Sequence, residues 1–200
     1  KREQSKEERA HYSNATTYIE YDFPFGWKEI EGIANRTDFD LKAHSKHSGQ
    51  DLSYTDKESG EKFIPYVIEP SAGVDRVALA FLCEAYYEDK DRVVLNLHPK
   101  LAPYKVAVFP LLANKPELVK KAQETYNSLR STFNVPIAWD DRGNIGKRYY
   151  SQDEIGTPWC VTCDHQTLED DTVTARDRDT TNQERIKIQE LKNYFEEKLK

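Results

Sequence analysis

The chain has 200 residues, enough for one large domain or two small ones with a buried core. Its formal net charge of -6 argues against nucleic-acid binding through bulk charge, so any RNA contact must come from a local basic patch. Three cysteines give no paired disulfide framework, and no apolar run approaches membrane-spanning length. We therefore expect a soluble cytoplasmic protein with no membrane partner.

The first part of the chain predicts a small antiparallel sheet. Residues 1–15 mix Lys, Arg and Glu at close spacing, which predicts a solvent-exposed helix. Residues 17–25 and 27–35 are rich in β-branched and aromatic side chains, so we expect them to pair as an antiparallel hairpin. A short helix over 39–47 and a strand over 62–69 are expected to follow.

A predicted strand, a tight turn and a predicted helix follow one another over residues 66–82. The turn carries Glu69, Ser71 and Gly73, and Arg76 lies in the first turn of the helix. Small residues let a ligand approach the backbone, and the unpaired N–H groups at a helix start favour anions. The residues thus predict a phosphate site beside a carboxylate that can bind an ammonium group. The plain alternative is a strand-end turn in which Glu69 caps a neighbouring helix.

The second part of the chain alternates predicted strands and helices, which indicates a mostly parallel or mixed sheet covered on both faces. A charged stretch at 88–92 and two prolines within 95–103 suggest a domain boundary between residues 93 and 94. The expected strands lie at 105–112, 135–139, 158–162 and 171–178. The expected helices lie at 115–133, 145–155 and 183–199.

Three stretches carry a family resemblance. Residues 69–76, Glu-Pro-Ser-Ala-Gly-Val-Asp-Arg, resemble motif 3 of class II aminoacyl-tRNA synthetases in the form found in glycyl-tRNA synthetases. Residues 27–38 resemble a second signature of that family. Residues 143–150 and 153–158 resemble the anticodon-binding domain shared by the glycyl, threonyl, prolyl and histidyl enzymes. The resemblance covers nearly the whole chain.

The resemblance implies a mixed fold class, α+β followed by α/β. Residues 1–93 would be the end of a class II catalytic core, with part of its antiparallel sheet. Residues 94–200 would be an α/β anticodon-binding domain with a mixed, mostly parallel sheet flanked by helices. The implied activity of the whole enzyme is ATP-dependent adenylation of glycine and transfer to tRNA-Gly by a homodimer. Motifs 1 and 2 are not found before Lys1, so we expect the chain alone to be inactive.

The resemblance also implies a glycine site. Its residues would be Glu69, Pro70, Ser71, Ala72, Gly73 and Arg36. Glu69 would take the α-ammonium group, and Arg36 would approach the carboxylate. Glu69 and Ser71 lie two apart on an extended segment, so their side chains share one face. Such a pocket would select glycine by size.

For ATP, the resemblance implies binding by Glu29, Ile30, Gly73, Val74, Asp75 and Arg76. Arg76 and Glu29 would be the catalytic residues. The Arg76 guanidinium would hold the γ-phosphate, and Glu29 would act through a Mg²⁺ ion that bridges phosphates. Glu29 and Glu31 alternate on the predicted strand and are expected to share a face. The carboxylate of glycine attacks the α-phosphate itself, so positioning and electrostatics suffice without a protein base.

In the second half, Lys147, Arg148 and Tyr149 are the expected tRNA contacts. The two cations begin a predicted helix, and Tyr149 with Tyr150 would offer stacking faces to unpaired bases. An ordinary amphipathic surface is the alternative. Two further arginines, Arg176 and Arg178, alternate with Asp177 and Asp179, so they either extend this surface or form a salt-bridge ladder, and we favour the ladder.

No intrinsic metal site is predicted. Cys160 and Cys163 have metal-like spacing, but a zinc site needs about four ligands and no second pair is present, so we expect both to be strand residues. His44 and His47 are expected to be solvated. The implied small molecules are therefore glycine and ATP with Mg²⁺, without a prosthetic group.

Two non-catalytic functions remain as alternatives. The first is a synthetase-like accessory protein, such as the processivity subunit of a mitochondrial DNA polymerase, which keeps the fold without the chemistry. The joint presence of Glu69, Ser71 and Arg76 argues against it. The second is a free-standing RNA-binding module that uses the first half as a scaffold.

Overall fold

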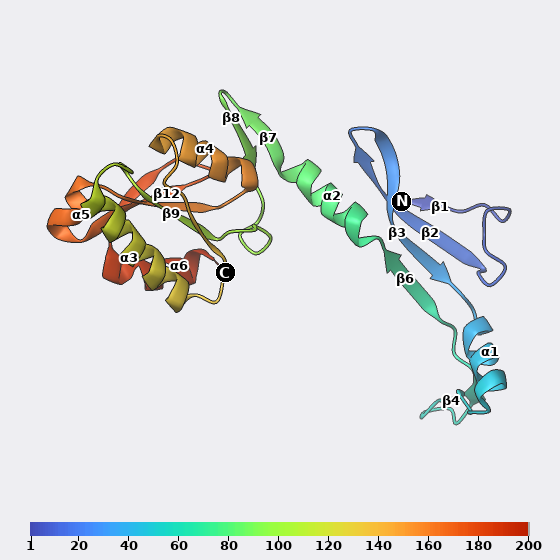
Figure 1. The fold of residues 1–200 in the computed structure, drawn as a ribbon. Helices are drawn as coiled ribbons and strands as arrows, with labels where there is room; N and C mark the ends of the chain where they lie inside the picture. Colours follow the sequence, from blue (N-terminus) through green and yellow to red (C-terminus); the bar gives the residue numbers. More distant parts are fainter. Residues whose placement is uncertain (200) are drawn as a thin grey trace. The chain divides into compact units, whose positions relative to one another are not determined.

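The computed structural model describes residues 1–199, and the chain divides into two compact units, Lys1–Cys83 and Glu84–Lys200 (Figure 1). The boundary expected between residues 93 and 94 falls inside strand β8 (Arg92–Leu95). This strand pairs with β7 (Tyr86–Asp89), and helix α4 of the second unit packs against it. Each unit is described by itself below.

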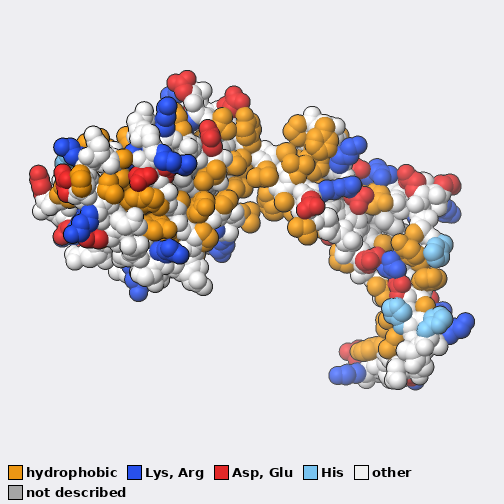
Figure 2. Space-filling model, in the orientation of Figure 1, with side chains coloured by type: hydrophobic (Ala, Val, Ile, Leu, Met, Phe, Trp, Pro, Cys, Tyr) orange, Lys and Arg blue, Asp and Glu red, His pale blue; other side chains and the backbone are white. Residues whose placement is uncertain are grey.

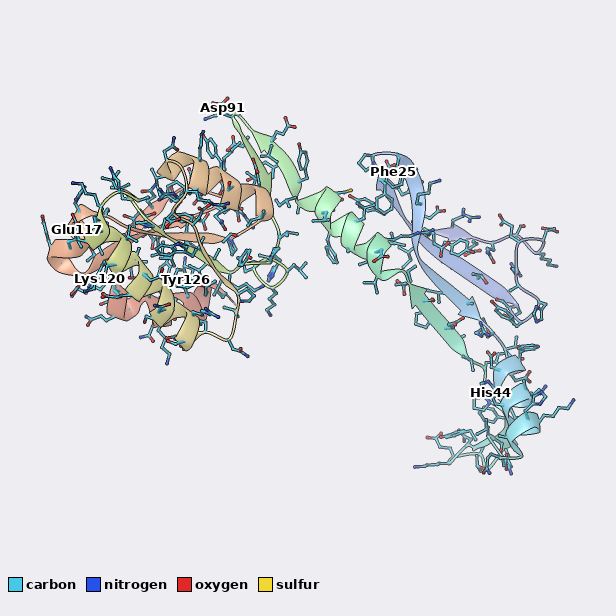
Figure 3. All side chains as sticks on the ribbon, viewed as in Figure 1. Phe25, His44, Asp91, Glu117, Lys120 and Tyr126 are labelled. Atoms are coloured by element: carbon cyan, nitrogen blue, oxygen red, sulfur yellow. The ribbon has the colours of Figure 1, made fainter. Side chains whose placement is uncertain are left out.

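The first unit is built on a four-stranded sheet in the order β1-β2-β3-β6, in which all neighbours are antiparallel. The strands are β1 (Arg2–Glu3), β2 (Ala15–Phe23), β3 (Gly26–Asn35) and β6 (Ile68–Ala72). The predicted hairpin is confirmed, and Figure 3 labels Phe25 at its turn. The helix predicted over residues 1–15 is wrong. Its charges lack a 3.6-residue apolar period, and Glu3 instead pairs with Thr17 at the sheet edge.

A small projection connects β3 to β6. It contains α1 (Phe39–Ser48), which carries His44 (Figure 3), and the short hairpin of β4 (Tyr54–Thr55) and β5 (Lys62–Phe63). Helix α1 confirms the prediction over 39–47, and it ends at Gly49 in the left-handed conformation (φ 72°). His44 and His47 are exposed, as expected for solvated side chains.

Helix α2 (Val74–Ala85) begins directly after β6. Its sequence is largely apolar, yet Ala85 alone is buried among its residues, and Val74 is 81% exposed. Figure 2 shows hydrophobic side chains at the surface of this unit. The predicted strand–turn–helix unit is confirmed, although the strand begins and ends later than expected.

The second unit contains the β7–β8 hairpin and a five-stranded mixed sheet in the order β10-β9-β11-β12-β13. These strands are β9 (Val106–Pro110), β10 (Ile137–Trp139), β11 (Trp159–Cys163), β12 (Thr172–Asp177) and β13 (Gln183–Lys187). Strand β9 is parallel to both of its neighbours, whereas β11-β12 and β12-β13 are antiparallel. The mixed sheet agrees with the predicted fold class.

Helices cover both faces of this sheet (Figure 1). They are α3 (Pro116–Thr132), α4 (Ile145–Ile155), α5 (His165–Asp170) and α6 (Leu191–Lys198), with a short 3₁₀ turn over Ile188–Glu190. Val106 and Val108 pack with residues of α3 and α6, whereas Ala107 and Phe109 pack toward α4. Because β9 is buried on both faces, its sequence is apolar at every position.

One predicted helix was too long. Residues 183–187 form strand β13 instead of the first turns of the last helix, which begins at Leu191. Only Ile186 is buried in this strand, and its backbone completes the antiparallel edge of the sheet beside β12. Tertiary pairing here overrides a polar sequence without strong strand character.

A buried cluster of charges ties the β7–β8 hairpin to the sheet. Asp153 of α4 is 0% exposed and accepts two hydrogen bonds from Arg176 (2.8 and 2.9 Å) and one from Arg92 (3.1 Å). Arg178 pairs with Asp179 but also donates to the carbonyls of Leu97 and Gly156. The ladder expected for Arg176 and Arg178 is therefore wrong for Arg176, whose partner comes from a helix.

Candidate functional site

The turn between β6 and α2 forms a pocket of about 460 Å³ in the first unit. The Gly73 N–H donates to the Ile30 carbonyl (3.3 Å), and Arg76 Nη1 donates to the Glu29 carbonyl (2.8 Å). These bonds attach the start of α2 to strand β3. The pocket is lined by Glu29, Ile30, Ser71, Ala72, Gly73, Val74, Asp75 and Arg76. The structure thus brings together all six residues predicted for ATP.

A β-bulge in β3 determines where Glu29 points. Ile19 pairs with Glu31 and Glu20 pairs with Glu29, which leaves Ile30 without a partner on β2. The Glu29 carboxylate consequently lies on the face of Gly32, where its Oε1 is 3.6 Å from the position of an added Cβ. The prediction that Glu29 and Glu31 share a face is wrong, because a bulge resets the alternation of side chains.

The same face carries the expected glycine-binding side chains. Ser71 is the cross-strand partner of Gly32, and Glu69 is the partner of Ala34. Cross-strand partners project to the same side of a sheet. Glu29, Ser71 and Glu69 therefore project from one side of the sheet, whereas Pro70 pairs with Ile33 and projects to the other.

Arg36 and Glu69, both predicted to bind glycine, form an ion pair with each other (2.9 Å). Arg36 also donates two hydrogen bonds to Asp40 (2.6 and 2.8 Å) and lies 4.0 Å from the centre of the Tyr12 ring. These bonds from Arg36 hold the pKa of Asp40 below its usual value. Glu69 is 45% exposed, and no hydrogen bond to its Oε1 is found within residues 1–199. One carboxylate oxygen thus remains available, and the alternative of a helix-capping Glu69 is not what this geometry shows.

In the second unit, loops at the carboxyl ends of the parallel strands form another pocket, of about 440 Å³. It is lined by Leu111, Leu112, Ala113, Asn114, Gly143, Asn144, Ile145 and Arg148. The loop after β9 leads to α3 and the loop after β10 leads to α4, on opposite faces of the sheet. Such a switch point in an α/β sheet opens a crevice between adjacent strand ends, where ligands bind.

The three expected tRNA contacts lie in different environments. Lys147 is exposed in the first turn of α4, whose N-cap residue Asn144 accepts a hydrogen bond from the Lys147 N–H (2.9 Å). Arg148, however, is 2% exposed and donates only to backbone carbonyls. It is therefore not a surface cation. The exposed fractions of Lys147 and Arg148 differ because successive residues of a helix point in different directions.

Tyr149 is also not an open stacking face. Its hydroxyl forms a 2.6 Å hydrogen bond with Thr162, and its ring packs against the edge of Phe109 and beneath Arg176. Burial raises the pKa of this phenol above its ordinary value. Tyr150, by contrast, is exposed. Sequence reasoning missed the loop after β9, whose residues Leu111–Asn114 could have been found from their place after a buried parallel strand.

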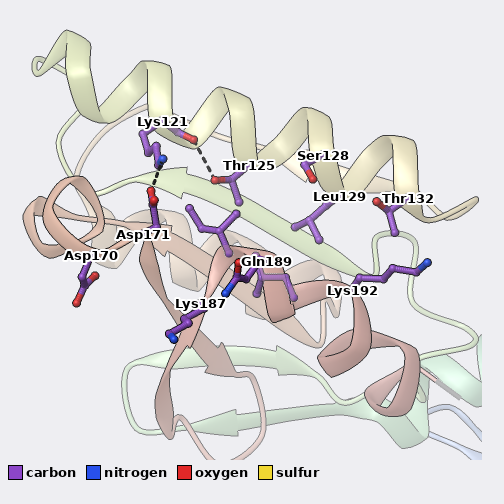
Figure 4. Close-up of a pocket in the computed structure, with 12 residues that line it drawn as sticks. Lys121, Thr125, Ser128, Leu129, Thr132, Asp170, Asp171, Lys187, Gln189 and Lys192 are labelled. Atoms are coloured by element: carbon purple, nitrogen blue, oxygen red, sulfur yellow. Dashed lines mark hydrogen bonds and ion pairs between the residues drawn. The ribbon is translucent and has the colours of Figure 1, made fainter.

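The largest of these three pockets, of about 610 Å³, lies elsewhere in the second unit, between α3, the start of β12 and α6 (Figure 4). Leu129 and Leu191 form its buried floor, and a Lys121–Asp171 ion pair closes one end. Lys187 and Lys192 lie at its rim. None of the predicted site residues lines it, and its size alone does not assign a ligand.

The described residues, 1–199, contain no group of three or more His, Cys, Asp or Glu side chains arranged to hold a metal ion. Cys160 and Cys163 are buried in β11, as expected for strand residues. Burial raises the pKa of the Cys163 thiol to about 11. Within the same residues, no helix has the length and apolar character needed to cross a bilayer.

Comparisons with known proteins bear on both units. Residues 105–198 match the family model described as an anticodon binding domain. The whole chain is 54% identical to the glycine–tRNA ligase of Clostridium acetobutylicum and 56% identical to that of Caldanaerobacter subterraneus, and it spans 43% of the length of each. A solved structure of prolyl-tRNA synthetase from Cryptosporidium parvum has a similar fold, with a TM-score of 0.68 at 20% identity, over 98% of this chain and 41% of that one. The chain is therefore similar over its full length to the C-terminal part of glycine–tRNA ligases, and its second unit matches an anticodon binding domain.

Proposed function

We propose that the protein acts in the ATP-dependent adenylation of glycine and its transfer to tRNA-Gly, as part of a cytoplasmic, homodimeric glycine–tRNA ligase. The observation that carries this proposal is the pocket at the β6–α2 turn, where Glu29, Ser71 and Arg76 meet. The identity of 54–56% to glycine–tRNA ligases supports the choice of amino acid.

On this proposal the Arg76 guanidinium binds the terminal phosphates of ATP and stabilises the negative charge on the departing pyrophosphate. Its bond to the Glu29 carbonyl orients it toward the pocket. The Glu29 carboxylate, in the same pocket, fits a Mg²⁺ ion that is held jointly by phosphate oxygens, since Mg²⁺ sites commonly use one or two carboxylates. The ion would supply charge neutralisation on the phosphates.

Glycine would bind on the same face of the sheet. The free Oε1 of Glu69 accepts the α-ammonium group, while the ion pair with Arg36 orients the Glu69 carboxylate. Ser71 lies on this face and offers a hydroxyl. Arg36 would therefore act on glycine through Glu69 as well as by its own charge.

For tRNA, we propose that Glu84–Lys200 forms the anticodon-binding unit and that unpaired anticodon bases enter the crevice between the loops after β9 and β10. The crevice has apolar walls from Leu111 and Leu112 and side-chain amides at Asn114 and Asn144. Apolar faces and amide groups are what an unpaired base needs from a protein. Exposed Lys147 would contact phosphate beside it.

The adenylation part is tested by glycine-dependent exchange of pyrophosphate into ATP, measured on the full-length enzyme that carries this chain. Arg76→Ala is expected to lower the exchange rate by about 10²–10³-fold, as for removal of a group that stabilises developing charge. Arg130→Ala, at an exposed position of α3, is the control and should leave the rate unchanged. Equal rates for the two variants would contradict the role proposed for Arg76, and absence of exchange in the unmodified enzyme would favour the non-catalytic accessory protein.

A further inference from the structure

The buried guanidinium of Arg148 is bound by backbone carbonyls alone. Nε donates to the Arg142 carbonyl (2.9 Å), and Nη2 donates to those of Asp141 (3.2 Å) and Gly143 (2.8 Å). Nη1 donates to the Pro110 carbonyl. Within residues 1–199 no carboxylate forms an ion pair with Arg148, so all of its hydrogen bonds go to main chain.

These four carbonyls belong to two different loops. Pro110 is the last residue of β9, where the loop to α3 begins, whereas residues 141–143 form the loop between β10 and α4. Both loops line the crevice at the switch point, and Arg148 lines it too. The Arg148 side chain therefore connects the two loops that form the walls of the crevice.

The chemistry of the group suits this task. A guanidinium presents five N–H donors in a fixed plane, so it can hold several carbonyls at set positions at once. Without a cation the four carbonyl dipoles would converge on one another and repel. A Lys ammonium has three donors and no planar fork, so it cannot keep the same spacing between the loops.

We infer that Arg148 is a positioning residue of the RNA site, which sets the separation of the two loops so that an unpaired base fits between them, while its hydrogen bonds go to main chain and not to RNA. The inference rests on the proposed anticodon-binding function and names a residue through which it works. Arg142 contributes its carbonyl to this arrangement, but its side chain lies in a different environment. Its side chain is 87% exposed and pairs with Asp140.

The test measures the dissociation constants of two RNA hairpins for the 200-residue chain. One hairpin carries the anticodon loop of tRNA-Gly, and the other has the same stem with a changed loop sequence. The chain should bind the first more tightly. Arg148→Lys should weaken binding of the anticodon hairpin about tenfold and remove most of the preference between loops, because the crevice no longer fits a base. Arg142→Lys, the matched control, should keep the preference.

A second variant separates positioning from general stability. Arg148→Ala leaves a space of the shape of a guanidinium ion, so millimolar guanidinium chloride should restore the loop preference, whereas the same concentration of potassium chloride should not. Circular dichroism at the assay temperature checks that each variant is folded. Hydrogen exchange should rise at both loops, residues 111–115 and 140–144, in Arg148→Lys.

The outcomes test the proposed RNA-binding function and the positioning role of Arg148 separately. If the unmodified chain does not prefer the anticodon hairpin, the proposed RNA-binding function is wrong. If it does, and a folded Arg148→Lys chain keeps the full preference, the positioning role of Arg148 is wrong while the proposed function stands. Recovery by potassium as well as guanidinium would also overturn the positioning role.

Discussion

The Arg36 guanidinium determines which groups of the glycine site remain available. It donates to Asp40 and to one oxygen of Glu69, which leaves the other oxygen of Glu69 for an ammonium group. The two residues that resemblance assigned separately to the two ends of glycine are thus one hydrogen-bonded unit. Substitution of either residue by a neutral one would change the net charge of the site and also remove the Arg36–Glu69 ion pair.

At the same scale, Gly156 occupies a position that other residues cannot adopt without strain. Its φ is 82°, and an added Cβ would lie 2.9 Å from the Leu95 carbonyl oxygen. We expect Gly156→Ala to lower the free energy of unfolding by about 1–3 kcal/mol. Urea unfolding measures this. The control is Gly143→Ala, where φ is 62° but the nearest atom is the flexible Lys147 Cδ at 3.8 Å, and a loss as large there would contradict the steric argument.

At the scale of elements, two local irregularities build the two candidate sites. The bulge at Ile30 turns Glu29 to the face that carries Ser71. In the second unit, the N-cap of α4 ends the loop that lines the crevice, and Asn144 Oδ1 accepts the Lys147 N–H there. The bulge places the Glu29 carboxylate on a face that a regular strand would not give it, and the N-cap places the Asn144 side chain at the crevice.

The N-cap of α4 gives a prediction for a single element. Asn144→Ala removes the side-chain acceptor and is expected to lower the free energy of unfolding by about 1 kcal/mol. Lys115→Ala is the matched control, because Lys115 is the N-cap of α3 and makes no side-chain cap bond there, so its loss should stay below about 0.5 kcal/mol. Thermal melting of the two variants checks the difference, and identical melting temperatures would refute the capping role.

At the scale of the whole molecule, each unit has its own source of stability. The second unit has a continuous apolar core on both faces of its sheet, together with a buried charge cluster. The first unit buries few side chains and exposes apolar ones on α2. The charge cluster fixes the β7–β8 hairpin against α4, so the hairpin belongs to the second unit although the change in composition suggested otherwise.

Breaking this cluster is expected to cost far more than breaking a surface pair. Asp153→Asn leaves Arg176 and Arg92 without their shared buried carboxylate, so the free energy of unfolding should fall by about 3–5 kcal/mol. Glu196→Gln removes the exposed pair with Lys192 (3.9 Å) and should cost less than about 0.5 kcal/mol. Urea unfolding followed by circular dichroism measures both. Similar losses would mean that burial does not set the strength of the cluster.

Sequence patterns recovered the elements whose signal is local. The β2–β3 hairpin, the β6–α2 turn and the apolar strand β9 follow from alternation, chain breakers and unbroken apolar runs. Residues 2–3, within the helix expected over 1–15, and residues 183–187 are strands instead, because their backbones pair with β2 and β12 whatever their own propensity.

The sequence by itself determined the resemblance to glycyl-tRNA synthetases, the strand–turn–helix unit and the residues that line its pocket, since motif and period are properties of neighbouring positions. Tertiary structure alone decided what those side chains do. It turned Glu29 to the other face of the sheet by a bulge, paired Arg36 with Glu69, buried Arg148 and partly buried Tyr149, although Lys147 beside them is exposed. The physical reason is that burial and hydrogen-bond partners come from segments distant in the chain, which no local pattern contains.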